Sequence, residues 1–335
     1  MTEISYIPEG EVKEGEVKVD ENKKDGNLMI QETLEGNIEW LRGEIIDKGQ
    51  FASVYLFQKK VLIENEGEKY AAKIVNKCNP AMRNRMLIEI DIHKKFDHPN
   101  IIELISHFET KCHLVNVLEY CPDKNLMQHL NLIRVIPEDK VKNMFSQVIN
   151  GLEYIHKLGI VHRDLKLANI LLKGEEVKIC DFGLSVIIGQ EHSIDNAGTP
   201  IYQSPESIIE FDLFYAKLNK SKDEEKKILL KSVEFEEYKQ KCYGMDVWSL
   251  GVCIYFSVIG KVPFDARNRV KLNDKIINLN YSFPEEVEIP ILNKNIKDVK
   301  VVVPSSDFKN LISKIFVRFD RLSLEQVKNH QFFVK

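Results

Sequence analysis

The chain has 335 residues, of which 44% are hydrophobic and 29% are charged, a balance typical of a globular protein with one large or two medium cores. This composition excludes collagen-like, coiled-coil and wholly disordered proteins. The formal net charge of −4 is too close to neutral for a protein that binds nucleic acid through a dominant basic surface. The six cysteines include no C-x-x-C pair, so we expect reduced intracellular thiols rather than a zinc site or disulfides.

The first 37 residues are acidic and poor in apolar side chains. Residues 1–36 hold ten acidic residues and four lysines, a net charge of −6. This pattern predicts a disordered tail over residues 1–37, which is either a solubilising tail or an interaction arm. No secretory signal is visible, and no window approaches the ~18 apolar residues of a membrane span. We therefore expect no membrane partner and interpret the apolar stretch 247–260 as a buried helix.

The rest of the chain is predicted to be α+β with two lobes. Runs typical of β-strands occur at 44–46, 53–58, 70–75, 103–109 and 113–118, with a helical pattern at 81–96 between the third and fourth. Helical patterns dominate beyond residue 125. We therefore expect a small antiparallel sheet with one helix over residues 38–121 and a mainly helical lobe over 122–335. A lysine- and glutamate-rich segment at about 211–241 interrupts that lobe.

The string HRDLKLAN at 162–169, followed by DFG at 181–183, carries the chemistry. A carboxylate, a lysine and an amide this close together suit phosphoryl transfer, which needs an oriented nucleophile and neutralised phosphate charge. The chain here resembles the eukaryotic protein kinase family, from Glu44 to the C-terminus, and the lysine of HRDLK is typical of its serine/threonine branch. The resemblance implies a bilobal kinase fold that binds ATP and Mg²⁺ in its cleft.

Within these two strings, the resemblance implies a role for each polar residue. Asp164 would orient the substrate hydroxyl and accept its proton, while Lys166 would steady the transferring γ-phosphate. Asn169 and Asp181 would hold Mg²⁺. Each of these residues taken alone is more often a hydrogen-bonded turn residue, so the joint order of the strings carries the prediction.

The phosphate-binding residues of the first lobe follow from the same resemblance. Lys73 closes a Y-A-A-K string that resembles the V-A-I-K strand, and the family spacing makes Glu89 its ion-pair partner. The glycine-rich loop is thinned, because only the central Gly49 remains and Ala52 replaces another glycine. Asp47 stands where the first glycine is usual, and a carboxylate near polyphosphate is repulsive. We expect weaker ATP binding, not its loss.

The adenine site is implied by counting along the family pattern. Leu118 takes the gatekeeper position, and the hinge that follows binds the adenine edge through Glu119 and Cys121. Apolar residues of this kind are more often simple core residues, so only their register makes them ligand contacts. The remaining expected contacts are Ile46, Val54, Ala71 and Leu171.

Further strings match the family's activation segment and its anchors. G-T-P at 198–200 and S-P-E at 204–206 close a segment that builds a peptide-binding platform, and the spacing implies a buried pair of Glu206 with Arg321. Asp246, in the string DVWSLG, would bond the backbone of the catalytic loop.

Activation can be interpreted in two ways. Arg163 of HRD normally binds a phosphate four residues before the G-T-P threonine, and that position is Asp195. Asp195 would then supply a fixed negative charge. The alternative is that Asp195 is a solvated loop residue and that Ser193 is phosphorylated instead.

We therefore expect an intracellular, cytoplasmic or nuclear, serine/threonine protein kinase that acts on protein substrates, in cell-cycle or signalling control, as a monomer without nucleic-acid partners. Ala52, Ala168 and the HRDLKL string resemble polo-like kinases. The 211–241 insert would serve a regulatory or docking partner, or be a tolerated solvated excursion. Two alternatives remain: a pseudokinase scaffold with weakened ATP binding, and a kinase-fold enzyme for small molecules.

Overall fold

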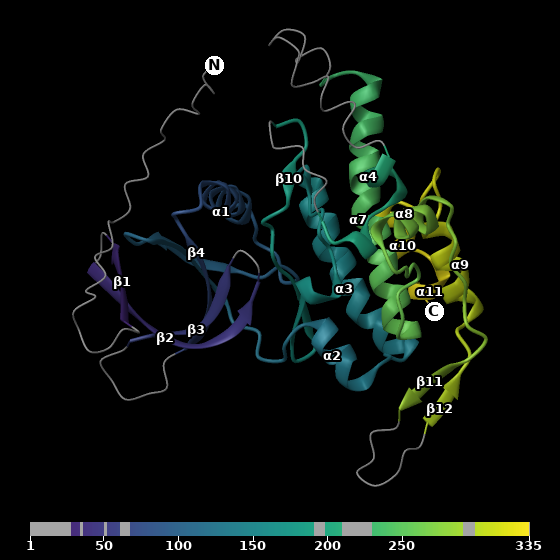
Figure 1. Ribbon diagram of the computed structural model, residues 1–335, viewed down its shortest axis with the longest axis horizontal. Coiled ribbons are helices and arrows are strands. Elements are labelled where there is room, and N and C mark those ends of the chain that lie inside the picture. The colour runs from purple at the N-terminus through teal and green to yellow at the C-terminus, as the bar shows by residue number, and fades with distance from the viewer. Residues whose placement is uncertain are drawn as a thin grey trace. The chain divides into compact units, whose positions relative to one another are not determined.

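The computed structural model describes residues 28–33, 36–49, 52–60, 68–190, 198–209, 230–290 and 299–334. The chain divides into two compact units, Met1–Lys94 with Glu103–Tyr120 and Lys95–Ile102 with Cys121–Lys335 (Figure 1). The expected boundary near residue 121 is close to this division, but residues 95–102 were expected in the first lobe and belong to the second. They do so because Ile102 donates its N–H to Ile179 O at 2.9 Å and Ile179 donates to Asn100 O at 2.9 Å.

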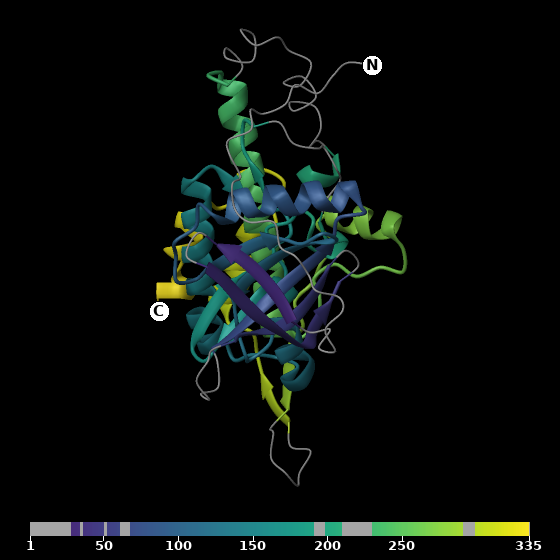
Figure 2. The ribbon, with the colours of Figure 1, turned by 90° about the vertical axis from the view of Figure 1, so that its left-hand side faces the viewer.

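The first unit is a six-stranded antiparallel sheet with one helix. Its strand order is β1-β2-β3-β4-β6-β5. Asn79 caps the helix α1 by accepting from Met82 N–H at 3.2 Å, and Pro80 begins it with a fixed φ. Figure 2 shows the strands facing the viewer with α1 lying across them. The bounds are β1 Leu28–Thr33, β2 Gly36–Lys48, β3 Ser53–Lys59, β4 Lys69–Asn76, α1 Pro80–His93, β5 Leu104–Glu109 and β6 His113–Glu119.

Strand β1 was not expected, and it corrects the prediction of a disordered tail through residue 37. β1 pairs along its whole length with β2, from Leu28 opposite Leu41 to Thr33 opposite Gly36. Met29 of β1 is buried in the same apolar cluster as Trp40. The strand forms because this cluster gives its apolar side chains a place in the core, which the net charge of the tail does not reveal. Residues 1–27 lie outside the described part.

A buried hydrogen-bond chain fixes the β1–β2 hairpin against β5. Trp40 donates its indole Nε1–H to Gln31 Oε1 at 3.0 Å, and the Gln31 amide in turn contacts Ser106 Oγ at 2.7 Å. Trp40 also packs edge-on against Tyr70, with ring centroids 5.4 Å apart. The polar atoms of the hairpin are therefore satisfied inside the core.

Trp40→Ala is expected to lower the free energy of unfolding of the first unit by about 3–5 kcal/mol, because it removes a buried aromatic ring and its hydrogen bond to Gln31. Trp40 is only 2% exposed. Urea denaturation followed by circular dichroism measures the loss. The matched control is Leu41→Ala, since Leu41 is the neighbouring residue and is 40% exposed. Equal losses for the two variants would show that the hairpin is not part of the core.

The second unit is mainly helical, and its described residues also form three pairs of short strands. Its helices are α2 Leu126–Ile133, α3 Glu138–Lys157, α4 Pro205–Ile209, α7 Val233–Ile259, α8 Arg269–Ile277, α9 Ser306–Ile315, α10 Leu324–Lys328 and α11 Gln331–Val334. Its strands are β7 Ile160–Val161, β8 Ile170–Lys173, β9 Glu176–Ile179, β10 Val186–Ile187, β11 Val287–Pro290 and β12 Val299–Val302. The β11–β12 hairpin was not expected from the sequence.

Helix α7 is the central helix of this unit. Its Trp248 is fully buried and stacks on Phe264, with ring centroids 5.5 Å apart. Its length and composition would allow it to cross a membrane, but 83% of its most apolar stretch is buried inside the protein. That burial confirms the prediction of a buried helix at 247–260 and is typical of the core helix of a folded domain.

Part of the expected charged insert belongs to α7, which corrects the 211–241 boundary. Ser232 caps the helix by accepting from Phe235 N–H at 3.1 Å, so residues 233–241 are helical. They are ordered because Tyr238 and Cys242 pack with Val161 in one buried cluster. Residues 211–229 of the insert lie outside the described residues, as do Ser193 and Asp195.

Candidate active site

The backbone of the catalytic loop, residues 162–169, is anchored by hydrogen bonds to the carboxylate of Asp246 in α7. Asp246 accepts the N–H of His162 at 2.9 Å and the N–H of Arg163 at 3.0 Å. These two bonds confirm the predicted role of Asp246. Arg163 has a φ of +66°, a left-handed conformation that is uncommon for a residue with a side chain. The two hydrogen bonds stabilise this turn of the loop.

His156 completes the anchor, and sequence reasoning missed it. Its Nε2 lies 2.8 Å from the Asp246 carboxylate, while its ring stacks on Tyr243 with centroids 4.4 Å apart. Burial alone would raise the pKa of Asp246, but its hydrogen bonds and electrostatic interactions with His156 and His162 together outweigh burial and lower that pKa below its usual value. Asp246 is therefore charged at neutral pH. No local signal in the chain links these two residues, which are 90 positions apart.

Asp164 is the centre of a compact polar cluster. Thr199 donates both its backbone N–H, at 2.9 Å, and its hydroxyl, at 2.8 Å, to Asp164 Oδ1. Lys166 Nζ donates to Asp164 Oδ2 at 2.6 Å and to Thr199 Oγ1 at 3.1 Å. The carboxylate, which is 7% exposed in its side chain, thus has a single orientation. Thr199 was noted in the G-T-P string, but its contact with Asp164 is a finding of the structure.

Gly198 lets Thr199 reach the carboxylate. Gly198 has a φ of +104°, and a Cβ at this position would lie 2.8 Å from the Arg163 carbonyl oxygen. Only glycine combines this backbone conformation with so close an approach. The G-T-P string therefore joins the activation segment to the catalytic loop.

Asn169 and Asp181 are placed next to each other by the backbone. Asn169 Nδ2 donates to the Asp164 carbonyl at 2.9 Å, which uses its nitrogen and turns its amide oxygen away. Cys180 N–H donates to Asn169 O at 3.0 Å, so Asp181, the next residue, follows directly. Asp181 has a φ of +66°. An amide oxygen and a carboxylate are the oxygen ligands that suit Mg²⁺.

The DFG phenylalanine packs beneath this pair. Phe182 is fully buried, and its ring lies 5.1 Å from the His162 ring and 4.6 Å from the Phe96 ring. His162 also contacts Cys180 O at 3.1 Å through Nε2. The HRD and DFG strings therefore fold as one unit around a shared aromatic core.

In the first unit, the predicted ion pair of Lys73 with Glu89 is formed. Lys73 Nζ lies 2.7 Å from both Glu89 carboxylate oxygens, and the two side chains are 16% and 5% exposed. α1 positions Glu89 because its Met86 and Ile90 pack in a buried cluster with Val75 and Leu114 of the sheet. A pair this buried is held much more firmly than a surface pair.

The structure distributes the expected nucleotide contacts over both units. In the first, Val54 lies opposite Lys73 and Ala71 opposite Leu118, so these side chains share one face of the sheet. In the thinned loop, Gly49 N–H donates to Ala52 O at 3.0 Å. The first unit also holds Ile46 and Glu119, and the second holds Cys121 and Leu171. Their roles in binding remain predictions.

Asp47 is exposed, and its carboxylate is used locally. It accepts the N–H of Lys48 at 2.8 Å. Asp47 lies opposite Val54, and Val54 lies opposite Lys73, so Val54 separates Asp47 from Lys73 along the sheet. The charge of Asp47 is therefore solvated, and its carboxylate accepts a hydrogen bond from the neighbouring backbone.

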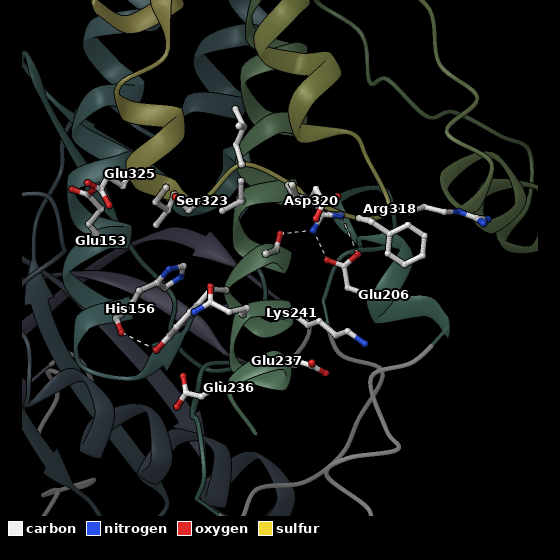
Figure 3. Close-up of a pocket in the computed structure, with 18 of the residues that line it drawn as sticks. Glu153, His156, Glu206, Glu236, Glu237, Lys241, Arg318, Asp320, Ser323 and Glu325 are labelled. Carbon is white, nitrogen blue, oxygen red and sulfur yellow. Dashed lines mark hydrogen bonds and ion pairs between the residues drawn. The ribbon is translucent and has the colours of Figure 1, made fainter. Parts of the chain in front are cut away.

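The end of the activation segment is anchored by the predicted pair of Glu206 with Arg321. Figure 3 shows Glu206 among the residues that line the surrounding cavity. Arg321 Nη2 lies 3.0 Å from Glu206 Oε2, and the guanidinium also donates to Gly244 O at 2.7 Å. A cavity of about 1500 Å³ opens around this pair and reaches His156 and Phe319. Asp164 and Asp181 do not line it, so it is distinct from the catalytic loop.

The comparisons with known proteins agree with this geometry. The model of the protein kinase domain family matches residues 40–333. The cell cycle serine/threonine-protein kinase CDC5/MSD2 of Saccharomyces cerevisiae is 32% identical over 257 residues, which cover 75% of this chain and 32% of that protein. Sperm motility kinase 3A of Mus musculus is 34% identical over 247 residues, which cover 73% of this chain and 42% of that protein.

The match to a rice relative extends over a larger share of that relative's length. The serine/threonine-protein kinase SAPK9 of Oryza sativa subsp. japonica is 32% identical over 302 residues, which are 87% of this chain and 70% of that protein. The chain spans only about a third of the yeast relative. The family match over most of the chain, together with the intact HRD and DFG geometry, leads to one conclusion: the chain belongs to the protein kinase family, in its serine/threonine branch.

Proposed function

We propose that this chain transfers the γ-phosphate of ATP to serine and threonine hydroxyls of protein substrates. The observation that carries the proposal is the cluster in which Thr199 and Lys166 fix the Asp164 carboxylate. A carboxylate held in one orientation by three donors can position a substrate hydroxyl for in-line attack.

The chain's own residues act on the hydroxyl and on the phosphate charge. Asp164 orients the substrate O–H and takes its proton as the oxygen–phosphorus bond forms and the bond to the leaving diphosphate breaks. Lys166, 2.6 Å from that carboxylate, presents its ammonium to the transferring phosphoryl group. Lys73, fixed by Glu89, neutralises charge on the α- and β-phosphates.

Asn169 and Asp181 would hold Mg²⁺, because they bring an amide oxygen and a carboxylate to neighbouring positions. Bound Mg²⁺ neutralises developing charge on the phosphate oxygens. Asn169 is also tied to the Asp164 backbone, so the metal-holding residue and the proton acceptor keep a fixed relation. ATP and Mg²⁺ are the cofactors that this set of residues fits.

The pseudokinase alternative rests on Asp47 and the thinned glycine loop. Against it stand the intact pair of Lys73 with Glu89 and the exposed position of Asp47. The small-molecule alternative is disfavoured by Gly198 and Thr199, which join a peptide-binding segment to the catalytic carboxylate. We therefore keep the protein kinase activity as the proposal.

The pathway is proposed from the relatives' names. The yeast relative is named a cell cycle kinase, and the resemblance to polo-like kinases rests on Ala52, Ala168 and the HRDLKL string. We place this chain in cell-cycle or signalling control on that basis.

Radiolabelled γ-phosphate transfer to casein, and to matched peptides that carry serine, threonine or tyrosine, tests the proposal. We expect label on serine and threonine peptides with Mg²⁺ and none after chelation by EDTA. ATP binding in a thermal shift assay without transfer would identify a scaffold. Transfer to small hydroxyl compounds but to no peptide or protein would identify the small-molecule enzyme.

A further inference from the structure

Asn116, in the middle of β6, carries a buried amide that has no hydrogen-bond partner in the described part of the chain. Its side chain is 0% exposed, and neither Nδ2 nor Oδ1 has a partner among the described residues. Leaving a buried amide unsatisfied costs more stability than an apolar residue of the same size would. Such a group in a folded protein needs an explanation.

The register of the sheet shows what Asn116 faces. Lys73 of β4 lies directly opposite it on one side and His107 of β5 on the other. Residues directly opposite each other in antiparallel strands point to the same face, about 4.5–5.5 Å apart at Cβ. Asn116 therefore shares a face with the Lys73 ammonium.

That face is the one covered by α1. Leu114, two residues before Asn116 on the same side of β6, packs with Met86 and Ile90 of α1. Val115 and Val117, which alternate with Asn116, belong to the cluster on the opposite face with Trp40. The amide is thus buried on the same side of the sheet as the pair of Lys73 with Glu89.

Lys73 can serve more than one acceptor. An ammonium has three N–H donors, and Glu89 accepts from it at 2.7 Å through each carboxylate oxygen. The lysine stem has enough rotatable bonds to carry Nζ from α1 back toward its neighbour on β6. The amide oxygen of Asn116 is an acceptor within that reach.

The geometry points to Asn116 as a positioning residue that accepts the Lys73 ammonium when Glu89 releases it. In the state described here Glu89 holds the lysine and the amide lacks a partner. When Glu89 is withdrawn, the Asn116 amide oxygen accepts a hydrogen bond from the buried ammonium. The free-energy cost of leaving that amide oxygen unsatisfied is then removed as well. Because Asn116 is a second acceptor, breaking the ion pair of Lys73 with Glu89 does not leave an uncompensated buried charge. The ion pair can therefore open and close reversibly.

An effect of this exchange of acceptors on phosphate transfer rests on the proposed function, but the exchange itself does not. The test therefore reads Lys73 directly. Acetylation of Lys73 by sulfo-N-hydroxysuccinimide acetate is followed by mass spectrometry on the full chain. The reagent attacks the neutral amine, so loss of an acceptor, which lowers the lysine pKa, speeds labelling.

Five chains are compared: wild type, Asn116→Leu, Glu89→Gln, and Glu89→Gln combined with Asn116→Leu or with Asn116→Asp. Once Glu89→Gln has weakened the ion pair, we expect the added Asn116→Leu to speed Lys73 labelling about tenfold, as loss of a hydrogen bond to a charged group allows. We expect the added Asn116→Asp to slow it about tenfold, because a carboxylate now lies beside the ammonium. In the wild-type background, Asn116→Leu should change labelling by less than about twofold.

The matched control is Gln31→Leu, which removes a buried amide from the opposite face of the same sheet. In the Glu89→Gln background it should leave Lys73 labelling as it was. Equal effects of Asn116→Leu with and without Glu89 would overturn the proposal, because the amide would then not take over the ammonium when Glu89 releases it.

The Asp arm keeps the test decisive if the Leu variant fails to fold. If Asn116→Asp in the Glu89→Gln background leaves labelling unchanged, position 116 is out of reach of Lys73 and the proposal is wrong. Phosphate transfer is measured on the same chains: an inactive wild type with the expected labelling pattern would contradict the proposed function and leave the acceptor exchange standing.

Discussion

Asp164→Asn is expected to lower kcat for phosphate transfer by about 10²–10⁴-fold, the range of a general base. The amide cannot take the hydroxyl proton. Its NH₂ group is a donor, so it cannot accept all the hydrogen bonds that Thr199 and Lys166 donate to the wild-type carboxylate. The KM for ATP should change little, since no phosphate contact is removed. Steady-state transfer to casein at varied ATP measures both constants.

The control for this variant is Asp139→Asn. Asp139 is an exposed carboxylate in the first turn of α3, so its substitution changes the net charge equally without touching the catalytic loop. It should retain wild-type kcat. If Asp164→Asn keeps more than about a tenth of the wild-type kcat, Asp164 is not the proton acceptor.

Arg321→Leu is expected to lower the free energy of unfolding by about 3–5 kcal/mol, because it leaves Glu206 as an uncompensated, largely buried charge. The two side chains are 8% and 14% exposed. The substitution also removes donors to Gly244 O and Val317 O and the cation–π contact with Trp248. Urea denaturation followed by tryptophan fluorescence measures the loss, and the Trp40→Ala background leaves Trp248 as the single tryptophan that reports it.

Lys328→Leu provides the comparison. Lys328 and Glu153 form an ion pair 2.7 Å long in the same unit, but these side chains are 45% and 20% exposed. Losing this pair should cost about 0–1 kcal/mol because solvent screens it. A loss for Arg321→Leu as small as that for Lys328→Leu would mean that the pair does not anchor the activation segment.

Lowering the pH should weaken the anchor that Asp246 provides for the catalytic loop, because protonation of its carboxylate removes its contribution to stability. Because the pKa of Asp246 is lowered in the folded chain, its contribution to stability is complete above the unfolded value near 3.8 and is lost as pH falls through the folded value. Asp246 therefore stays charged through the whole neutral and mildly acidic range. The catalytic loop keeps its two backbone hydrogen bonds there.

The predictions that held were those carried by local strings and their spacing. The pairs of Lys73 with Glu89 and of Glu206 with Arg321, and the bonds of Asp246 to the loop backbone, form as expected. Each could be inferred because the family pattern keeps its distances along the chain. The α+β class followed from the change between β-type and helical periodicity near residue 125.

The predictions that failed concerned where ordered structure begins. β1 was missed because its acidic surroundings outweigh a short apolar pattern, although Met29 finds a place beside Trp40. The start of α7 was placed in a charged insert because its first turns are lysine- and glutamate-rich on the exposed side. Tyr238 on the other side, packed with Val161, decides that this segment is helical.

The sequence by itself therefore determined the family, the two-lobed class and the identity of the residues that handle phosphate, since chemistry requires particular side chains in a particular order. Only the tertiary structure decided how these side chains are held. The bonds of Thr199 to Asp164 and of His156 to Asp246 join residues 35 and 90 positions apart. The amide of Asn116, for which the described residues offer no partner, lies opposite Lys73 on a neighbouring strand. Such contacts depend on packing and register, which no local pattern encodes.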